Sequence, residues 1–164
     1  MAWDFAGKVT ETTNYSDSNQ SLLKKIKDDH FVSKLGEEAA KIVLSEFGVV
    51  KGPDYMIYEA KQKSWDDDLF VNNIGFAIKT QRRTAAKKYS LSWTFQSGTM
   101  RKDSILQRPL AWVIFVEYDD TQPYNCHVYP PYQINNLIFD VPKLAHLRGH
   151  KKVVYAETLN FTQQ

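Results

Sequence analysis

The hydrophobic pattern predicts an amphipathic helix from about Phe31 to Phe47, with Gly48 following as its end. Five apolar residues recur at helical spacing and form the predicted stripe: Phe31, Leu35, Ala39, Ile42 and Val43. Glu38 lies on the edge of this stripe, so we expect its carboxylate to face inward towards a partner, although a helix flank can also simply tolerate a glutamate. Glu37 lies on the opposite side and is expected to contact Lys41 at the surface.

Alternating and continuous apolar runs predict the strands of a sheet. They cover Asp54–Ala60, Leu69–Val71, Ile74–Lys79, Tyr89–Gln96, Ala111–Tyr118, His127–Tyr129 and Val153–Ala156. Asn72-Asn73 should form the turn between the second and third of these strands. Further short elements are predicted for Ser21–Lys27 (helix), Arg82–Lys88 (helix or loop), Pro130–Phe139 (helix) and Pro142–Leu147 (turn or helix). The order predicts an α/β (α+β) fold with a central mixed β-sheet flanked by helices.

Length and composition favour one folded domain. The 164 residues, 43% of them apolar, suit a single domain over 1–164, with a polar, loosely docked arm at 1–18. No apolar run is long enough to span a bilayer, and the N-terminus lacks the features of a signal peptide. One cysteine, Cys126, excludes an internal disulfide, so we expect a cytoplasmic protein.

Charge is distributed unevenly along the chain. Between Lys79 and Arg108 there are eight basic residues and one acid, Asp103, which makes this segment +7 in a chain of net +2 and leaves −5 for the remainder. The basic residues are Lys79, Arg82, Arg83, Lys87, Lys88, Arg101, Lys102 and Arg108. The segment is either a solvated basic face or a phosphate-binding surface.

The hairpin around Asn72-Asn73 carries the most specific chemistry. Pairing of its strands would bring Asp68 near Lys79, while Ala77, Lys79 and Gln81 share one face of their strand. Carboxylates bind Mg²⁺, and a nearby lysine stabilises the charge that develops on a phosphate. With Glu38, the hairpin therefore predicts a metal-dependent phosphodiesterase site.

The order of these elements resembles the PD-(D/E)XK nuclease superfamily, which has the restriction-endonuclease-like fold. The resemblance covers roughly Leu35 to Val116 and is carried by Gly36-Glu-Glu38, Asp68-Leu-Phe-Val and Phe76-Ala-Ile-Lys79-Thr-Gln81. It implies that Glu38 and Asp68 bind the metal, that Lys79 assists catalysis, and that Gln81 orients Lys79 or a water.

Position 77 departs from the superfamily pattern, because alanine stands where a metal-binding carboxylate is expected. Three explanations stay open. The site works with Glu38, Asp68, backbone carbonyls and Gln81, as the family tolerates migrated ligands; or the chain is a natural pseudo-nuclease; or Ala77 is an engineered inactivation. Pro53-Asp54 and Glu59-Ala-Lys61 also match the letters of the PD-(D/E)XK motif, and Glu59 is a weaker candidate for the site.

The resemblance implies a magnesium-dependent DNA endonuclease, with Mn²⁺ as a possible substitute, acting as a homodimer in restriction, junction resolution or phage DNA processing. Six residues are expected to bind the DNA backbone: Arg82, Arg83, Lys87, Lys88, Arg101 and Lys102. The alternatives are a catalytically inactive nuclease fold that binds nucleic acid or a partner protein, and a plain interaction module for an acidic protein.

Overall fold

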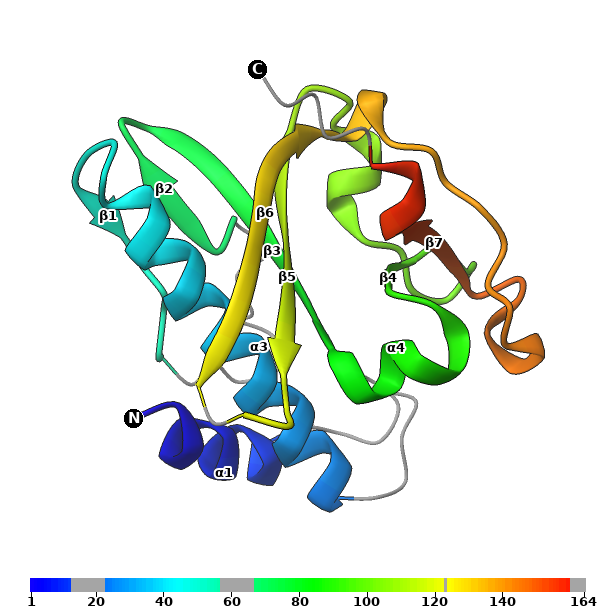
Figure 1. The fold of residues 1–164 in the computed structure, drawn as a ribbon, viewed down its shortest axis with the longest axis horizontal. Coiled ribbons are helices and arrows are strands. Elements are labelled where there is room, and N and C mark those ends of the chain that lie inside the picture. Colours follow the sequence, from blue (N-terminus) through cyan, green and yellow to red (C-terminus); the bar gives the residue numbers. More distant parts are fainter. Residues whose placement is uncertain (13–22, 57–66, 123, 160–164) are drawn as a thin grey trace.

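A computed structural model describes residues 1–12, 23–56, 67–122 and 124–159. Its main sheet has the strand order β1-β2-β3-β5-β6, built from β1 (Val50–Lys51), β2 (Leu69–Val71), β3 (Ile74–Arg82), β5 (Trp112–Asp119) and β6 (Asn125–Gln133). All neighbours are antiparallel except β3 and β5, which are parallel. The connection between these two strands contains α4 (Arg83–Tyr89), a further strand and a short 3-10 turn. The predicted mixed α/β class is therefore confirmed (Figure 1).

A second, two-stranded sheet lies beside the main one. It pairs β4 (Ser92–Gln96) with β7 (Lys151–Tyr155) in antiparallel register. Short 3-10 turns at Ser104–Gln107, Ile134–Asn136, Ala145–Leu147 and Ala156–Thr158 connect the remaining segments. The two sheets share a core in which the rings of Trp93 and Phe115 stack at 4.6 Å between centroids. This core fixes the position of β4 and β7 relative to β3.

Helix α3 (Leu23–Leu44) covers the other face of the main sheet and merges the two helices predicted there. Its contact with the sheet runs through Gly36, Ala40 and Leu44, which are buried. The predicted apolar stripe is wrong: the side chain of Ile42 is 71% exposed and that of Val43 is 41% exposed. Small residues decide the contact face, because they let the helix backbone approach β3 closely.

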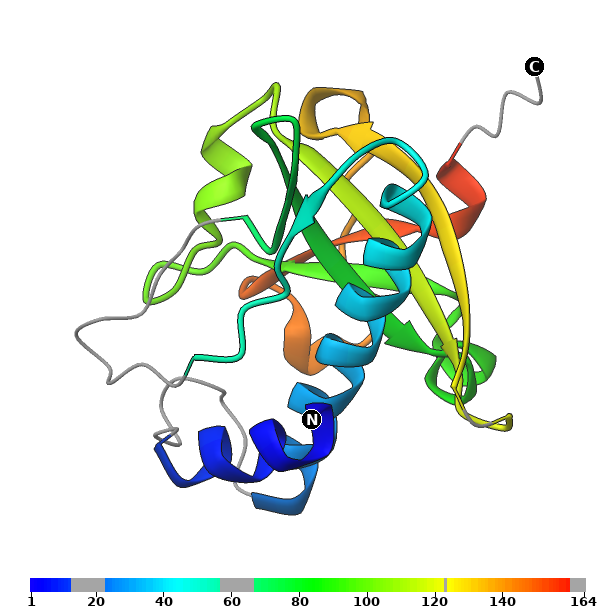
Figure 2. The same ribbon diagram turned by 90° about the vertical axis from the view of Figure 1, so that its left-hand side faces the viewer.

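The N-terminal segment contains a helix, α1 (Ala2–Thr12), within the predicted arm at 1–18. It packs against the N-terminal half of α3 (Figure 2). The Trp3 and Phe31 rings meet there edge to face, with 5.2 Å between their centroids. Phe31 therefore belongs to a helix–helix contact and not to the sheet contact. Residues 13–18 lie outside the described part of the chain.

Two local predictions fail at β-structure. The strand predicted for Asp54–Ala60 is not formed over 54–56, and 57–60 lie outside the described residues; the strand that pairs with β2 is β1. The helix predicted from Pro130 is instead part of β6. Because β6 is an edge strand, prolines without N–H groups are tolerated there, next to a register shift between Ile114 and Val116.

Gly36→Ala is expected to lower the free energy of unfolding by about 3 kcal/mol, the upper end for overpacking a core. A Cβ at Gly36 would lie 1.8 Å from the Thr80 hydroxyl oxygen. Urea denaturation followed by fluorescence measures the change. Gly98→Ala is the control, since a Cβ there meets no atom closer than 3.4 Å. Equal stability losses in both variants would contradict the close approach of α3 to β3.

Candidate functional site

The open edge of β3 positions the candidate site. β2 pairs only with Ile74–Phe76, so within the described chain β3 has no strand neighbour on that side beyond Phe76. Asp68 lies at this divergence. Its backbone N–H donates to the Phe76 carbonyl (3.0 Å), and its Oδ2 accepts from the Ile78 N–H (2.7 Å). The Asp68 carboxylate is thereby held in a fixed orientation where the two strands separate.

Glu37 is the glutamate that faces this edge, which corrects the expectation for Glu38. The residue is buried, at 3% exposure. Gly36 and Ala40 set the contact face of α3. Successive residues of a helix are rotated by about 100°, so Glu37 lies beside that face, whereas Glu38 points away from it. Burial, and then the negative charge of Asp68, raise the pKa of Glu37 from its ordinary 4.5 to about 7.

Lys34 partly neutralises Glu37 and Asp68, which we call the carboxylate pair. Its Nζ lies 2.6 Å from Glu37 Oε2, and the two side chains are only 12% and 4% exposed. The predicted surface contact between Glu37 and Lys41 is therefore replaced by a buried pair one turn earlier. Burial raises the pKa of Asp68, while the Ile78 N–H and the charges of Lys34 and Lys79 oppose that shift. The buried carboxylate of Glu37 is thus paired directly with Lys34, which acts on the half-buried Asp68 through its charge.

Glu38 is held elsewhere. The Tyr55 hydroxyl donates to Glu38 Oε1 at 2.7 Å. Burial and this hydrogen bond raise the pKa of Tyr55. A cleft of about 380 Å³ opens beside the other glutamate and is lined by Phe5, Lys34, Glu37, Lys51, Gly52, Asp54, Met56, Asp67, Asp68 and Phe70. Glu38 is not among the residues that line this cleft.

Lys79 lies within electrostatic range of Asp68, but its ion pair is with Asp103, at 2.8 Å. Its Nζ also sits 4.7 Å from the centre of the Phe95 ring. Asp103 accepts a second hydrogen bond from the Gln96 N–H at 3.1 Å, which fixes the carboxylate. Sequence reasoning missed Asp103 as a partner, although it is the single acid in the basic segment.

Ala77 and Gln81, which share one face of β3 with Lys79, have structural contacts. Ala77 packs against the core cluster that contains Trp93 and Phe115. The Gln81 side-chain oxygen accepts from the Arg82 N–H at 3.0 Å. The predicted orienting contact to Lys79 is supplied by Asp103, so a role for Gln81 stays a prediction.

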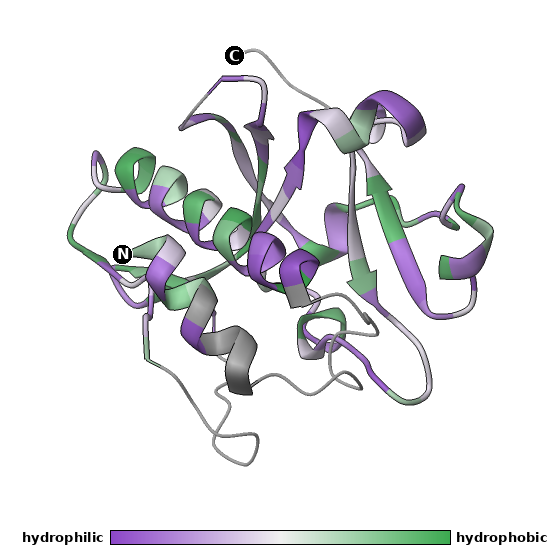
Figure 3. Cartoon of the chain, turned by 90° about the horizontal axis from the view of Figure 1, so that it is seen from below, coloured by the Kyte–Doolittle hydropathy of each residue, from purple (hydrophilic) through white to green (hydrophobic). Residues whose placement is uncertain are grey.

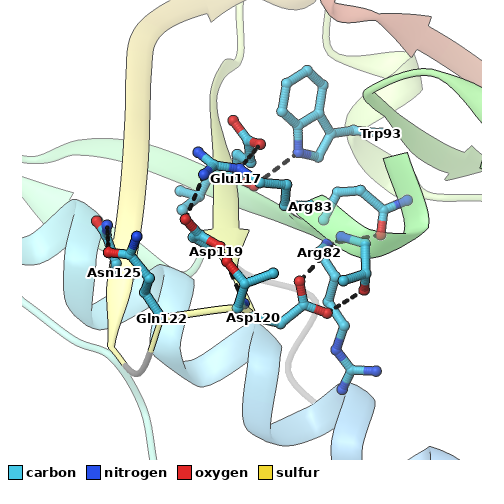
Figure 4. Close-up of polar contacts among 12 residues, drawn as sticks. Arg82, Arg83, Trp93, Glu117, Asp119, Asp120, Gln122 and Asn125 are labelled. Carbon is cyan, nitrogen blue, oxygen red and sulfur yellow. Dashed lines mark hydrogen bonds and ion pairs between the residues drawn. The ribbon is translucent and has the colours of Figure 1, made fainter. Parts of the chain in front are cut away.

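The residues expected to bind DNA fall into two groups. Arg83 forms ion pairs with two carboxylates of β5, Glu117 at 2.8 Å and Asp119 (Figure 4). Arg82 donates to the Asp28 carbonyl at 3.0 Å. The other four side chains are exposed: Lys87, Lys88, Arg101 and Lys102. Arg83 therefore anchors α4 to β5 and has little freedom to reach a ligand.

The carboxylate pair fits a magnesium ion by its chemistry. Among residues 1–12, 23–56, 67–122 and 124–159 there is no group of three or more His, Cys, Asp or Glu side chains suited to a metal. Mg²⁺ needs only one or two carboxylates, since it retains several waters. Glu37 and Asp68 provide two, next to a cleft. Glu59 lies outside the described residues.

No helix in the described ranges is long and apolar enough to cross a bilayer. Comparisons of the chain with known protein families, with curated proteins and with solved structures found no match.

Proposed function

We propose that the chain is a magnesium-dependent DNA endonuclease whose metal-binding carboxylates are Glu37 and Asp68. The observation that carries the proposal is that the buried Glu37 and the half-buried Asp68 line one cleft at the open edge of β3. Two carboxylates in electrostatic contact, each with a raised pKa, repel one another unless a proton or a cation lies between them. A divalent cation relieves that repulsion at neutral pH.

The order of the elements supports a restriction-endonuclease-like fold. Helix α3 with its inward glutamate is followed by β1, by β2 directly after Asp68, and by β3 with Lys79. This is the order in which the sequence resembles the PD-(D/E)XK superfamily, with Glu37 in place of Glu38. The parallel partner β5, reached through α4, places the core of the sheet behind the site.

Each residue has a distinct role in this proposal. A bound Mg²⁺ would polarise the phosphate and lower the pKa of a water. Glu37 and Asp68 hold the cation, and Asp68 is oriented by the Ile78 N–H. Lys79 donates hydrogen bonds to the phosphate oxygens that gain charge, with Asp103 setting its position. Lys34 compensates part of the negative charge of the two carboxylates.

Ala77 favours a second candidate, a nuclease-like protein that binds DNA without cutting it. The methyl group of Ala77 packs against the core and provides no ligand. In that case the two remaining carboxylates would not hold a cation tightly enough for catalysis.

A plasmid-nicking assay distinguishes the two candidates. The wild-type chain is expected to nick supercoiled DNA with Mg²⁺ or Mn²⁺ and to lose this activity in EDTA. Lys79→Ala is expected to lose cleavage while it keeps metal-dependent stabilisation, because Lys79 acts on the phosphate. Ala77→Glu is assayed beside the wild type with a melting curve, since it introduces a charge next to the core. Cleavage by Ala77→Glu alone would favour the binding-only candidate, and cleavage by neither chain would overturn the nuclease proposal.

A further inference from the structure

A basic groove runs along the same edge of β3, beyond the carboxylate pair. Its first part is a cleft of about 540 Å³ between α3, β3, β4 and the segment before β7. The charged residues that line it are Lys25, Asp29, Lys79, Arg82 and Lys151, with His146 at its rim. Lys79 thus belongs both to this cleft and to the electrostatic surroundings of Asp68.

A second cleft of about 280 Å³ adjoins the first, since the two share Gln81, Ala85, Ser92, Thr94, Leu144 and Leu147. Among the described residues it adds Lys88 and Lys143 and no acidic side chain. We call the two clefts together the basic groove. Of the residues that the structure describes, six lysine or arginine side chains and one aspartate line it.

The cations of the groove lie close enough to repel one another. Burial lowers the pKa of Lys151, and the positive charges of Lys79, Lys25 and Arg101 lower it further. The N-terminal turns of α3, which carry Lys25, form a hydrophilic end of that helix (Figure 3). Binding of a polyanion lowers the repulsion between these positive charges.

We propose that the basic groove binds a single strand of nucleic acid and leads its backbone past Lys79. A volume of a few hundred Å³ suits a small ligand or a short length of chain. A double helix, whose major groove alone is about 12 Å wide, is too bulky to enter it. Leu144, Leu147 and Tyr89 give the groove apolar and aromatic contacts for sugars and bases, as in other single-strand sites.

This inference deepens the proposed function by naming the substrate as single-stranded or locally unpaired DNA. It places Lys25 and Lys151 in contact with phosphates, although neither belongs to the basic segment between Lys79 and Arg108. It also gives Lys88 a place in the binding surface and leaves Arg83 to its ion pairs on β5.

The test is fluorescence anisotropy with a labelled oligothymidylate in EDTA, so that cleavage plays no part. Lys151→Glu is expected to weaken binding about tenfold. It should also reduce the slope of the logarithm of the binding constant against the logarithm of the salt concentration by about 0.7, the value for one phosphate of a single strand. Lys25→Glu should act in the same direction, and because Lys25 is exposed its substitution leaves the core packing unchanged.

Lys152→Glu is the matched control. Lys152 is the next residue of β7, points to the opposite face of the sheet and lies 5.9 Å from the Phe139 ring centre. It should retain binding to within about twofold, since long-range charge effects are screened beyond a Debye length. Equal losses for Lys151→Glu and Lys152→Glu would overturn the groove assignment. Displacement of the oligonucleotide by equimolar mononucleotide or inorganic phosphate would also overturn it.

A duplex of matching length distinguishes the substrate class. Tighter binding of the duplex than of the single strand, with the same sensitivity to Lys151→Glu, would overturn the single-strand proposal. The outcome is separable from the nuclease proposal. Groove-dependent binding without cleavage would leave the inference standing alone, whereas cleavage without any effect of Lys151→Glu on binding would leave only the nuclease.

Discussion

Glu37→Gln is expected to reduce Mg²⁺-dependent DNA cleavage by about 10²- to 10³-fold, whereas Glu38→Gln should retain activity to within a few-fold. Glutamine has nearly the shape of glutamate but lacks the charge that a cation needs. Glu37 is buried beside Asp68, and Glu38 is bonded to the Tyr55 hydroxyl. Initial rates of plasmid nicking over a range of Mg²⁺ concentrations measure the difference.

These two variants allow a direct comparison, because the two glutamates are adjacent on one helix and the substitutions are identical. Loss of cleavage in Glu38→Gln with retention in Glu37→Gln would return the metal site to the residue that the helical pattern favoured. A thermal melt of each variant shows that the fold is intact. The activity of Glu37→Gln should not recover at higher Mg²⁺ if the lost carboxylate is a ligand.

Glu37 should also make the protein less stable as the pH rises from about 4.5 to about 7. Its pKa is about 7 in the folded chain against an ordinary 4.5, so the folded state binds the proton more tightly than the unfolded state. The favourable contribution is therefore complete below pH 4.5 and is lost as the pH approaches 7. A pKa difference of this size corresponds to a change in the free energy of unfolding on the order of 3 kcal/mol.

Urea denaturation of the wild type and Glu37→Gln at several pH values isolates this contribution, because other titrating groups are common to both chains. We expect Glu37→Gln to be the more stable chain near pH 8 and the difference to vanish near pH 4.5. A constant difference between the two chains at all pH values would contradict the raised pKa.

Magnesium should reverse the same destabilisation. Near pH 8, Mg²⁺ at about ten times its Kd is expected to add about 1.4 kcal/mol to the free energy of unfolding of the wild type. Near pH 5 the effect should largely disappear, because protons compete for the carboxylates. A stabilisation of Glu37→Gln equal to that of the wild type would place the cation elsewhere.

Local sequence patterns were sufficient for the hairpin and the central strands. Asn72 and Asn73 adopt φ values of 49° and 65°, as a tight hairpin turn requires, and the flanking apolar runs form β2 and β3. The continuous apolar run of the central strand became β5, which is buried on both faces. Turn length fixes the register of β2 on β3 and places Asp68 beside Ile78, whereas Lys79 lies beyond the residues of β3 that pair with β2.

The rotation of α3 did not follow from its hydrophobic residues. Phe31 and Leu35 are large and apolar, yet the sheet contacts Gly36 and Ala40, because the helix must approach Thr80 closely. Phe31 packs instead on Trp3 of α1. A helical stripe that contacts two partners has no single direction, and for this reason the hydrophobic pattern favours Glu38 over Glu37.

The sequence by itself determined the mixed α/β class, the hairpin with Asp68 and Lys79, and the presence of a basic segment, since each depends on neighbours in the chain. Only the tertiary structure decided which glutamate joins Asp68, that Asp103 holds Lys79, and that Lys25 and Lys151 line one groove with it. Those contacts join α3, β3, β7 and the segment before the 3-10 turn at Ser104–Gln107. Their partners are set by packing between distant segments, which local periodicity does not encode.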